Sequence, residues 1–334
     1  MNENVIEVLR GTTVEARHRV HAAVVDAEGR LRASAGDPEL ITFFRSSAKP
    51  FQAIPLIDDG ACTRFGLTSE ELALCCGSHS GEPRHVQLAE SILRKIGLDG
   101  ESLACGAHAP FHEPTRRDLA DAGREPVRLH NNCSGKHAGM LALARVHGWD
   151  AAGYHLLEHP VQGRLLTELS RWVGIPYDAI ALATDGCGVV CHALPIRNMA
   201  LGFAQLAAAS RRGEPAASEV VGAMMDYPEM VAGLGRLCTE LMVQVEGRMF
   251  AKIGAEGVYC VGVPGAELGI ALKVEDGGKR AVAPAILAIL RQLDLISEED
   301  LGALQAHAFP EIGNSCGEIV GQIRPNIRLT TPHA

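Results

Sequence analysis

Alternating apolar and polar positions near both ends of the chain predict β-strands. Val20, Ala22 and Val24 occupy every second position, and a turn at residues 26–29 follows them. Side chains alternate between the two faces of a strand, so this period of two indicates a strand with one buried face. We predict an N-terminal hairpin within residues 5–35. Three antiparallel strands are expected near the C-terminus, at 249–253, 258–263 and 268–274.

The middle of the chain has the period of helices instead. Phe51, Ile54 and Ile57 recur every third residue, and Leu88 and Ile92 are separated by four, so each set lies on one helix face. Further segments with apolar faces are expected to form helices: 160–173, 198–212, 282–294 and 298–308.

Strands at both ends and helices between them predict an α+β fold. The simplest closure pairs the terminal strands in one antiparallel sheet, with a helical region beside it. No repeat or low-complexity linker divides the 334 residues. We therefore expect a single two-lobed domain over 1–334, in which about 5–40 and 245–334 form the sheet lobe and about 45–240 form the mainly helical lobe.

Composition and charge narrow the possible partners. The chain is 47% hydrophobic and 21% charged, with a net charge of -9 and no run of Lys or Arg. This charge argues against nucleic acid and against an anionic membrane as partners. The N-terminus is not followed by an apolar signal sequence, and the longest apolar runs are too short to span a bilayer. Ten cysteines without a secretory signal predict reduced thiols and a cytoplasmic location.

The first candidate for chemistry is the spacing Ser-x-x-Lys at Ser46 and Lys49. Three residues make about one helical turn, so both side chains emerge on one face, where a neutral lysine can accept the serine proton. Pro50 is tolerated only early in a helix, because it lacks the N–H that interior turns use. We therefore expect a helix to begin close to Ser46, with free N–H groups beside it for a developing oxyanion.

Two further motifs, a phosphate-binding loop and a nucleophile elbow, are excluded. Gly135 and Lys136 precede a helix, but the glycine and the Ser or Thr of a phosphate-binding loop are replaced by His130 and His137. Residues 77–81 lack the Gly-x-Ser-x-Gly frame of a nucleophile elbow, which argues against a Ser-His-Asp hydrolase.

Cysteines and histidines suggest a metal site. Cys133 with His137, and Cys187 with Cys191 and His192, have the residue types of zinc ligands. About fifty residues separate the two groups, so only the fold could join them. Unrelated pairs of reduced cysteines, or a catalytic Cys133–His137 pair, remain alternatives.

A third motif completes an order that is typical of serine enzymes acting on amides. Lys-Ile-Gly at 252–254 lies on a predicted strand, after the Ser-x-x-Lys helix and after Ser78 in a loop. Serine beta-lactamases and penicillin-binding proteins combine a Ser-x-x-Lys helix, a middle loop and a Lys-Thr-Gly strand in this order.

Taken together, five motifs resemble those of the rhizobial-type L-asparaginase family, also called the asparaginase II family. They are Arg-Ser-Ser-Ala-Lys-Pro at 45–50, Cys-Gly-Ser-His-Ser-Gly-Glu at 76–82, Asn-Asn-Cys-Ser-Gly-Lys-His at 131–137, Asp-Gly-Cys-Gly at 185–188 and Lys-Ile-Gly at 252–254. The resemblance runs from about residue 8 to residue 325. It implies a fold similar to serine beta-lactamases and serine glutaminases, and a homodimer.

The resemblance also implies roles for individual residues. Two Ser-Lys tandems carry the catalysis: Ser46 with Lys49, and Ser78 with Lys252. Zinc is expected, with Lys136 rather than His137 beside the two cysteines: the implied ligands are Cys133, Lys136 and Cys187. Four further groups are expected on the substrate side: Arg45, Asn131, His137 and Asp185.

We therefore expect hydrolysis of L-asparagine to L-aspartate and ammonia through an acyl-enzyme, with Ser46 as nucleophile. The sequence leaves two alternatives open. One is another serine hydrolase on this fold, acting on glutamine or a beta-lactam. The other is a non-enzymatic zinc-binding protein.

Overall fold

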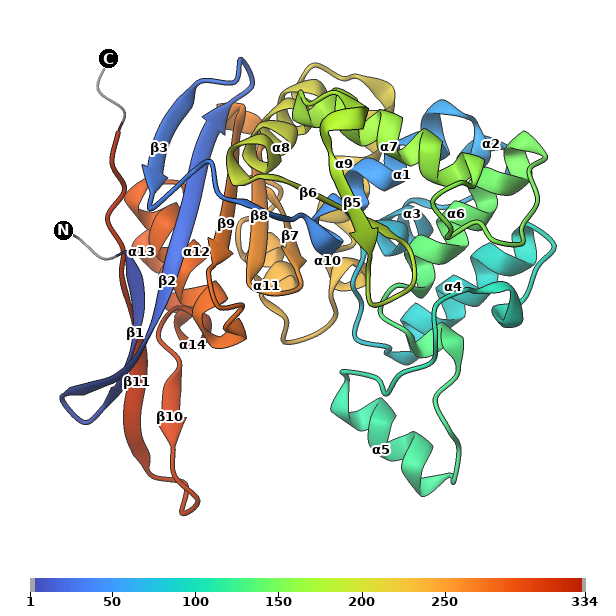
Figure 1. Ribbon diagram of the computed structural model, residues 1–334. Helices are drawn as coiled ribbons and strands as arrows, with labels where there is room; N and C mark the ends of the chain where they lie inside the picture. The colour runs from blue at the N-terminus through green and yellow to red at the C-terminus, as the bar shows by residue number, and fades with distance from the viewer. Residues whose placement is uncertain (1–3, 332–334) are drawn as a thin grey trace.

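A large antiparallel sheet built from both ends of the chain forms one side of the molecule (Figure 1). The computed structural model describes residues 4–331. The sheet has eight strands in the order β10-β11-β1-β2-β9-β8-β7, with β3 paired to β2. Their bounds are β1 Val5–Arg10, β2 Thr13–Asp26, β3 Leu31–Ala35, β7 Phe250–Gly254, β8 Val258–Val263, β9 Leu268–Val274, β10 Glu311–Gly313 and β11 Ile319–Asn326. The predicted α+β class and the sheet of terminal strands are confirmed.

The two ends of the chain meet at β1. This strand pairs with β2 on one side and with β11 on the other, so that Val8 faces both Ala16 and Ile323. The N-terminal region has three strands rather than the single hairpin that we predicted. The C-terminal tail shows no alternation of apolar residues, and it becomes a strand because β1 offers it an unpaired backbone edge.

Helices fill the space beside the sheet, and most lie on the opposite side of Figure 1. α8 packs directly against β2, β8 and β9, and so covers one face of the sheet. The α-helix bounds are α1 Lys49–Asp58, α2 Ala61–Phe65, α3 Ser69–Cys76, α4 Pro83–Lys95, α5 Glu113–Asp121, α6 Ser134–His147, α7 Pro160–Val173, α8 Ile196–Arg211, α9 Pro215–Asp226, α10 Pro228–Val231, α11 Leu237–Gln244, α12 Lys279–Gln292, α13 Glu298–Ala303 and α14 Gln305–Ala308. The segment predicted as one helix over 298–308 breaks at Leu304, into α13 and α14.

A second, three-stranded sheet lies among the helices, in the order β4-β6-β5. Its strands are β4 Ile41–Phe43, β5 Ala181–Thr184 and β6 Val190–Pro195. The sequence did not predict these strands, because each is only three to six residues long. The glycine-rich residues 185–188 form the turn between β5 and β6, where Gly188 donates its N–H to the carbonyl oxygen of Asp185.

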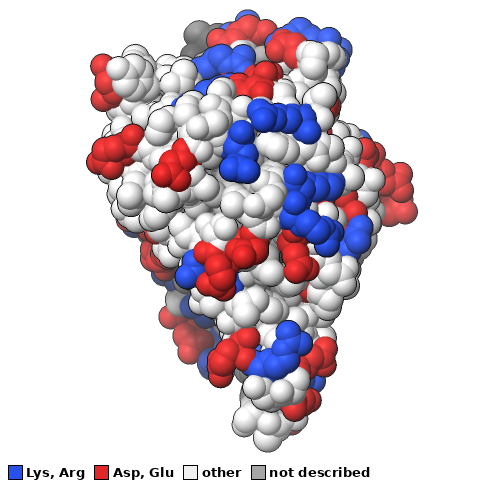
Figure 2. All heavy atoms as spheres, turned by 90° about the vertical axis from the view of Figure 1, so that its right-hand side faces the viewer, with Lys and Arg blue, Asp and Glu red and all other residues white. Residues whose placement is uncertain are grey.

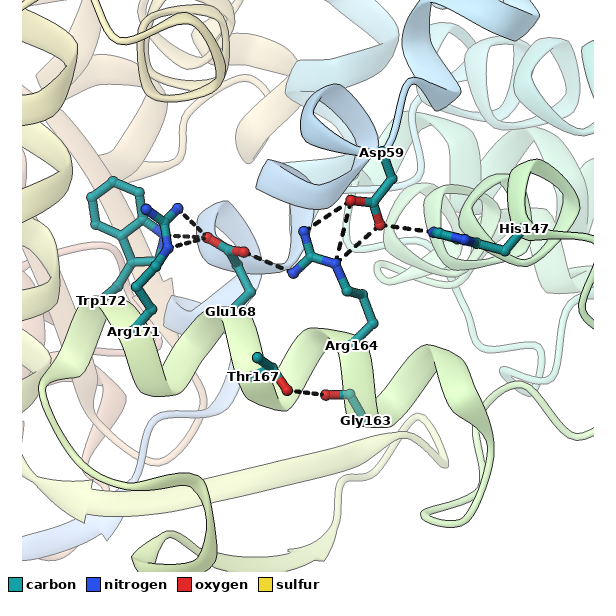
Figure 3. Close-up of polar contacts among 8 residues, drawn as sticks. All are labelled: Asp59, His147, Gly163, Arg164, Thr167, Glu168, Arg171 and Trp172. Atoms are coloured by element: carbon teal, nitrogen blue, oxygen red, sulfur yellow. Dashed lines mark hydrogen bonds and ion pairs between the residues drawn. The ribbon is translucent and has the colours of Figure 1, made fainter.

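An ion-pair network fixes the C-terminal end of α1 to α7 (Figure 3). Arg164 donates to both oxygens of Asp59, just after α1, and to Glu168 one turn further along α7. Glu168 is 4% exposed and also accepts hydrogen bonds from Arg171 and Trp172. The network therefore orients the helix whose first residue is Lys49.

The helical end of the molecule carries charges of both signs (Figure 2). Short groups of Lys and Arg side chains on this face are bordered by Asp and Glu side chains. None of the helices in the described part of the chain is both long enough and apolar enough to cross a membrane.

Candidate active site

Ser46 lies at the start of α1, as the position of Pro50 suggests. Residues Arg45–Ala48 form a 3₁₀ turn, and α1 follows from Lys49, with the proline in its first turn. Ser46 is half-buried, whereas Ser47 is fully buried and donates its hydroxyl to the Lys252 carbonyl oxygen. Ser46 is therefore the serine of this motif that can reach a substrate.

Lys49 points away from Ser46 and toward Ser78. Its Nζ donates to the Ser78 Oγ at 3.0 Å and to the Gly77 carbonyl oxygen at 2.5 Å. The Lys49 backbone N–H donates to the Ser46 carbonyl oxygen, but within residues 4–331 no hydrogen bond joins the Lys49 amine to the Ser46 hydroxyl. The predicted Ser46–Lys49 tandem shares one turn, but the lysine side chain serves the second serine.

Ser78 lies between two buried lysines. Its Oγ accepts from Lys252 Nζ at 2.8 Å, on β7, as well as from Lys49. The loop that carries Ser78 follows α3 and is held by the hydrogen bond from its N–H to the Val231 carbonyl oxygen. Gly77 permits this approach, because a Cβ there would lie 2.4 Å from the Met230 carbonyl oxygen.

Both lysines are easier to deprotonate than an exposed lysine. Burial, followed by the charge of Lys49, lowers the pKa of Lys252 to about 7. Burial also lowers the pKa of Lys49 below its ordinary value. A neutral amine beside Ser78 at neutral pH is what a serine hydrolase of the Ser-Lys type needs.

A pocket of about 430 Å³ opens beside the serines. Ser46 and Ser78 both line it, together with Asn132 and with residues 253–257, which follow Lys252. Because Ser78 is 4% exposed and Ser46 is half-buried, Ser46 presents the larger surface to this pocket.

The three implied zinc ligands converge behind the serines. Cys133 precedes α6, Lys136 lies in its first turn, and Cys187 comes from the β5–β6 turn. Lys136 Nζ lies 2.9 Å from Cys187 Sγ. A contact with Cys187 and the positive charges of Lys49 and Lys136 hold the pKa of the Cys133 thiol well below its ordinary value.

Two thiols and an amine that meet in a buried site fit a zinc ion by donor type. Among residues 4–331, no group of three or more His, Cys, Asp or Glu side chains could hold a metal. A zinc site would thus need the lysine. Burial lowers the pKa of Lys136, but the two thiols outweigh it and raise the pKa above its ordinary value, so zinc would have to displace a proton from this amine.

Close helix packing places the cysteine and lysine of this group. A Cβ on Gly135 would lie 2.5 Å from the Leu74 carbonyl oxygen, so only glycine lets α6 approach α3 this closely. The glycine of the 131–137 motif therefore has a packing function, and not the phosphate-binding function that we excluded.

Arg45 and Asp185, both expected on the substrate side, bind each other. Arg45 NH2 lies 2.8 Å from Asp185 Oδ1. Burial would raise the pKa of Asp185, but Arg45 and Lys136 lower it below its ordinary value. Asp185 therefore stays ionised and joins the serine motif to the turn that carries Cys187.

His137 and Asn131 are buried beside this group. The Tyr154 hydroxyl accepts from the Ala104 N–H and lies 2.5 Å from His137 Nδ1. His137 Nε2 is buried and has no hydrogen-bond partner among the described residues. Asn131 is occupied: its amide group bonds to the Gly106 carbonyl oxygen and the Cys133 N–H.

Two residues of the site were missed from the sequence. Tyr154 gives no signal, because it lies in an irregular segment and contacts His137 only through the fold. Arg236 also lines the serine pocket. The sequence contains an indication of this residue: the glycines at 233 and 235 mark a tight loop directly before Arg236.

Comparison with known families identifies the family of the chain. A family model described as L-asparaginase II matches residues 6–325. These features define an asparaginase-type amidohydrolase. The chain belongs to the L-asparaginase II family. Compared with curated proteins, it has no significant match.

Several solved structures are similar at low identity. Mglu is 16% identical over 83% of this chain and 67% of that chain, with a TM-score of 0.38. A putative beta-lactamase from Bacteroides dorei DSM 17855 is 13% identical over 82% and 94%, with a TM-score of 0.43. A beta-lactamase from Mycobacterium bovis is 16% identical over the same shares, with a TM-score of 0.41. The chain spans 59–67% of the length of the four Mglu chains. Identity this low indicates nothing about substrates.

Proposed function

We propose that the protein hydrolyses L-asparagine to L-aspartate and ammonia by an acyl-enzyme mechanism. The observation that supports this most is the position of Ser78, whose Oγ lies within 3.0 Å of two buried lysine Nζ atoms at the wall of a pocket that Ser46 also lines. The membership of the L-asparaginase II family supports the amide substrate.

Ser46 is the proposed nucleophile and Ser78 the proposed proton relay. Ser46 is more exposed than Ser78, and in the described part of the chain no lysine amine hydrogen-bonds to its hydroxyl. For Ser78 to relay a proton, Lys49 donates to its Oγ while neutral Lys252 accepts from it across the 2.8 Å contact, which leaves one lone pair for the Ser46 proton. Ser46 attacks the side-chain amide carbon as its proton passes to Ser78, and the Ser78 proton passes to neutral Lys252. The Lys49 N–H at the start of α1 is bonded to the Ser46 carbonyl oxygen and Pro50 has no N–H, so backbone N–H groups elsewhere near Ser46 would have to stabilise the oxyanion.

The remaining steps reverse this path. The proton returns from Lys252 through Ser78 to the leaving nitrogen, and ammonia departs as the Ser46 ester forms. Water then attacks the ester, gives its proton to the same relay and releases L-aspartate and Ser46. Arg45, Asn131, His137 and Asp185 are proposed as substrate-side groups. His137 Nε2 is a buried polar atom without a partner among the described residues, and a polar group of the substrate would satisfy it.

Zinc is proposed at Cys133, Lys136 and Cys187, where it would supply a Lewis acid that orients the α-amine side of the substrate. A homodimer and a cytoplasmic location remain predictions from the resemblance and the cysteine content.

Ammonia release from L-asparagine tests the function, and two serine variants test the roles. Ser46→Ala is expected to lower kcat by at least about 10³-fold, the range seen when activated nucleophiles are removed. Ser78→Ala should lower kcat strongly but still allow a slow Ser46 ester, visible as an acyl adduct by mass spectrometry. Near-normal turnover in Ser46→Ala, with none in Ser78→Ala, would exchange the two roles.

A further inference from the structure

The pocket beside the serines is lined by Arg236, which forms no ion pair among residues 4–331, although the exposed Glu256 lines the same pocket. Arg236 is half-buried directly before α11. Its guanidinium contacts Ser80 Oγ at 3.4 Å and lies 5.6 Å from the centre of the Phe111 ring. Neither contact neutralises the charge, and among residues 4–331 no Asp or Glu forms an ion pair with it. A positive charge of this kind in a pocket favours an anionic ligand.

The loop that carries Arg236 is fixed to the loop that carries Ser78. Ser80 Oγ donates to the Ala232 carbonyl oxygen at 2.9 Å, and the Leu234 N–H donates to Glu82 at the same distance. The Gly233 N–H donates to Thr239 in α11. These bonds hold the arginine at a set position relative to the serines before any substrate arrives.

We propose that Arg236 binds the carboxylate of the amino-acid substrate and thereby determines specificity, an inference that rests on the amidohydrolase function proposed above. A guanidinium group matches a carboxylate with two parallel N–H donors. An amide substrate with an α-carboxylate would place its reacting carbon at Ser46 and its charge at Arg236, within one pocket of about 430 Å³.

Two other cations are less suited to this task. The guanidinium of Arg45 is already paired with Asp185 at 2.8 Å. Lys279 also lines the pocket, but it is exposed at the first residue of α12, where water and salt screen it. Arg236 is the half-buried cation that remains available.

The test compares two amides that differ only in the carboxylate. L-asparagine carries it, and 3-aminopropanamide has the same amide and amine without it. Arg236→Gln is expected to raise KM for L-asparagine at least about tenfold while kcat changes less than about threefold, the pattern of lost ground-state binding. For 3-aminopropanamide, wild type and Arg236→Gln should agree. Arg236→Lys keeps the charge and should recover part of the affinity for L-asparagine.

Arg94→Gln, at an exposed position in the last turn of α4, is the matched control and should leave both substrates unaffected. An unchanged KM in Arg236→Gln would overturn the proposal. So would a KM increase that appears in Lys279→Gln and not in Arg236→Gln.

Calorimetric binding of L-aspartate separates this inference from the proposed function, because it needs no turnover. If the wild type releases no ammonia but Arg236→Gln binds L-aspartate at least about tenfold more weakly, the proposed reaction is wrong and the carboxylate site stands. Equal binding of L-aspartate by wild type and Arg236→Gln overturns the carboxylate site, whatever the turnover.

Discussion

Lys252 is completely buried on β7, and its amine lies against Ser78. Burial and the nearby charge of Lys49 lower its pKa to about 7. Only the neutral amine can accept a proton, so the active fraction falls about tenfold for each pH unit below that value. We expect kcat/KM for L-asparagine to rise with pH through about 7 and then level off, measured as ammonia release across buffers of constant ionic strength.

The Lys252→Arg variant tests whether Lys252 is the base that titrates. Lys252→Arg keeps the positive charge but cannot deprotonate in this range, so it should be inactive at every pH. Lys95→Arg, at the Lys95–Glu71 ion pair, is the control and should keep the wild-type profile. A profile with the same midpoint in Lys252→Arg would mean that another group titrates.

Sequence spacing explains part of this arrangement. It predicted that Ser46 and Lys49 share a turn, which is correct, because that depends only on neighbouring residues. It could not show that Lys49 turns to Ser78, which lies 29 positions away, or that Lys252 approaches the same serine from 174 positions away. Such contacts depend on how α1, α3 and β7 pack, and period and propensity do not encode that packing. The family resemblance supplied the Ser78–Lys252 pair instead.

At the scale of elements, Gly135 decides how closely α6 approaches α3. Gly135→Ala would bring a Cβ against the Leu74 carbonyl oxygen, so α6 must shift together with Cys133 and Lys136. We expect a loss of about 1–3 kcal/mol in the free energy of unfolding, measured by urea denaturation. Activity should fall further than this loss of stability explains.

Gly163→Ala is the matched control for that substitution. Gly163 is exposed within α7, and a Cβ there would meet no atom within 4 Å. Alanine should therefore stabilise the protein by about 0.5–1 kcal/mol, since glycine is the poorer helix former. If both glycine variants changed stability equally, the close packing of α6 and α3 would not be what requires Gly135.

The network at the C-terminal end of α1 is the second feature at this scale. Arg164→Met removes the partner of Asp59 and Glu168 and leaves a buried carboxylate with fewer donors. We expect a loss of about 1–3 kcal/mol in stability, because hydrogen bonds from a guanidinium to two carboxylates are lost, while Arg171 and Trp172 still donate to Glu168 and His147 still contacts Asp59. Arg117→Met breaks an exposed pair with Glu113 on α5 and should change stability by less than about 0.5 kcal/mol. Thermal and urea unfolding of the two variants would show whether the α1–α7 contact carries this difference.

Elements with strong local signals were predicted well. α7 has the predicted bounds of 160–173, and the helix face predicted at Leu88 and Ile92 lies in α4. β4, β5 and β6 were missed, because strands of three to six residues show too few alternations to stand out. β11 was missed for another reason: its exposed and half-buried residues do not alternate in hydrophobicity, and its partner β1 lies at the other end of the chain.

At the scale of the whole molecule, the zinc proposal predicts how much metal the purified protein contains. Protein purified without chelator should carry about one zinc per 35.5 kDa chain, measured by elemental analysis and native mass spectrometry. Cys133→Ala and Cys187→Ala should carry much less. Cys316→Ala, at an exposed cysteine, should carry the wild-type amount. Equal zinc in all four proteins would mean that the metal binds elsewhere. No zinc in the wild type would contradict the zinc proposal, and Lys136 would then be paired with the two thiols instead.

The position of β1 between β2 and β11 has a consequence for how the protein is made. Translation must pass residue 326 before β1 gains its second neighbour. Until then a newly synthesised chain carries β1 with one row of backbone groups unpaired, which is a template for joining other chains. Closing contacts across such a sequence distance is slow. Ribosomes that stall before residue 326 would therefore release products prone to aggregation, and chaperones that cover the N-terminal strands during synthesis should raise the yield of folded protein.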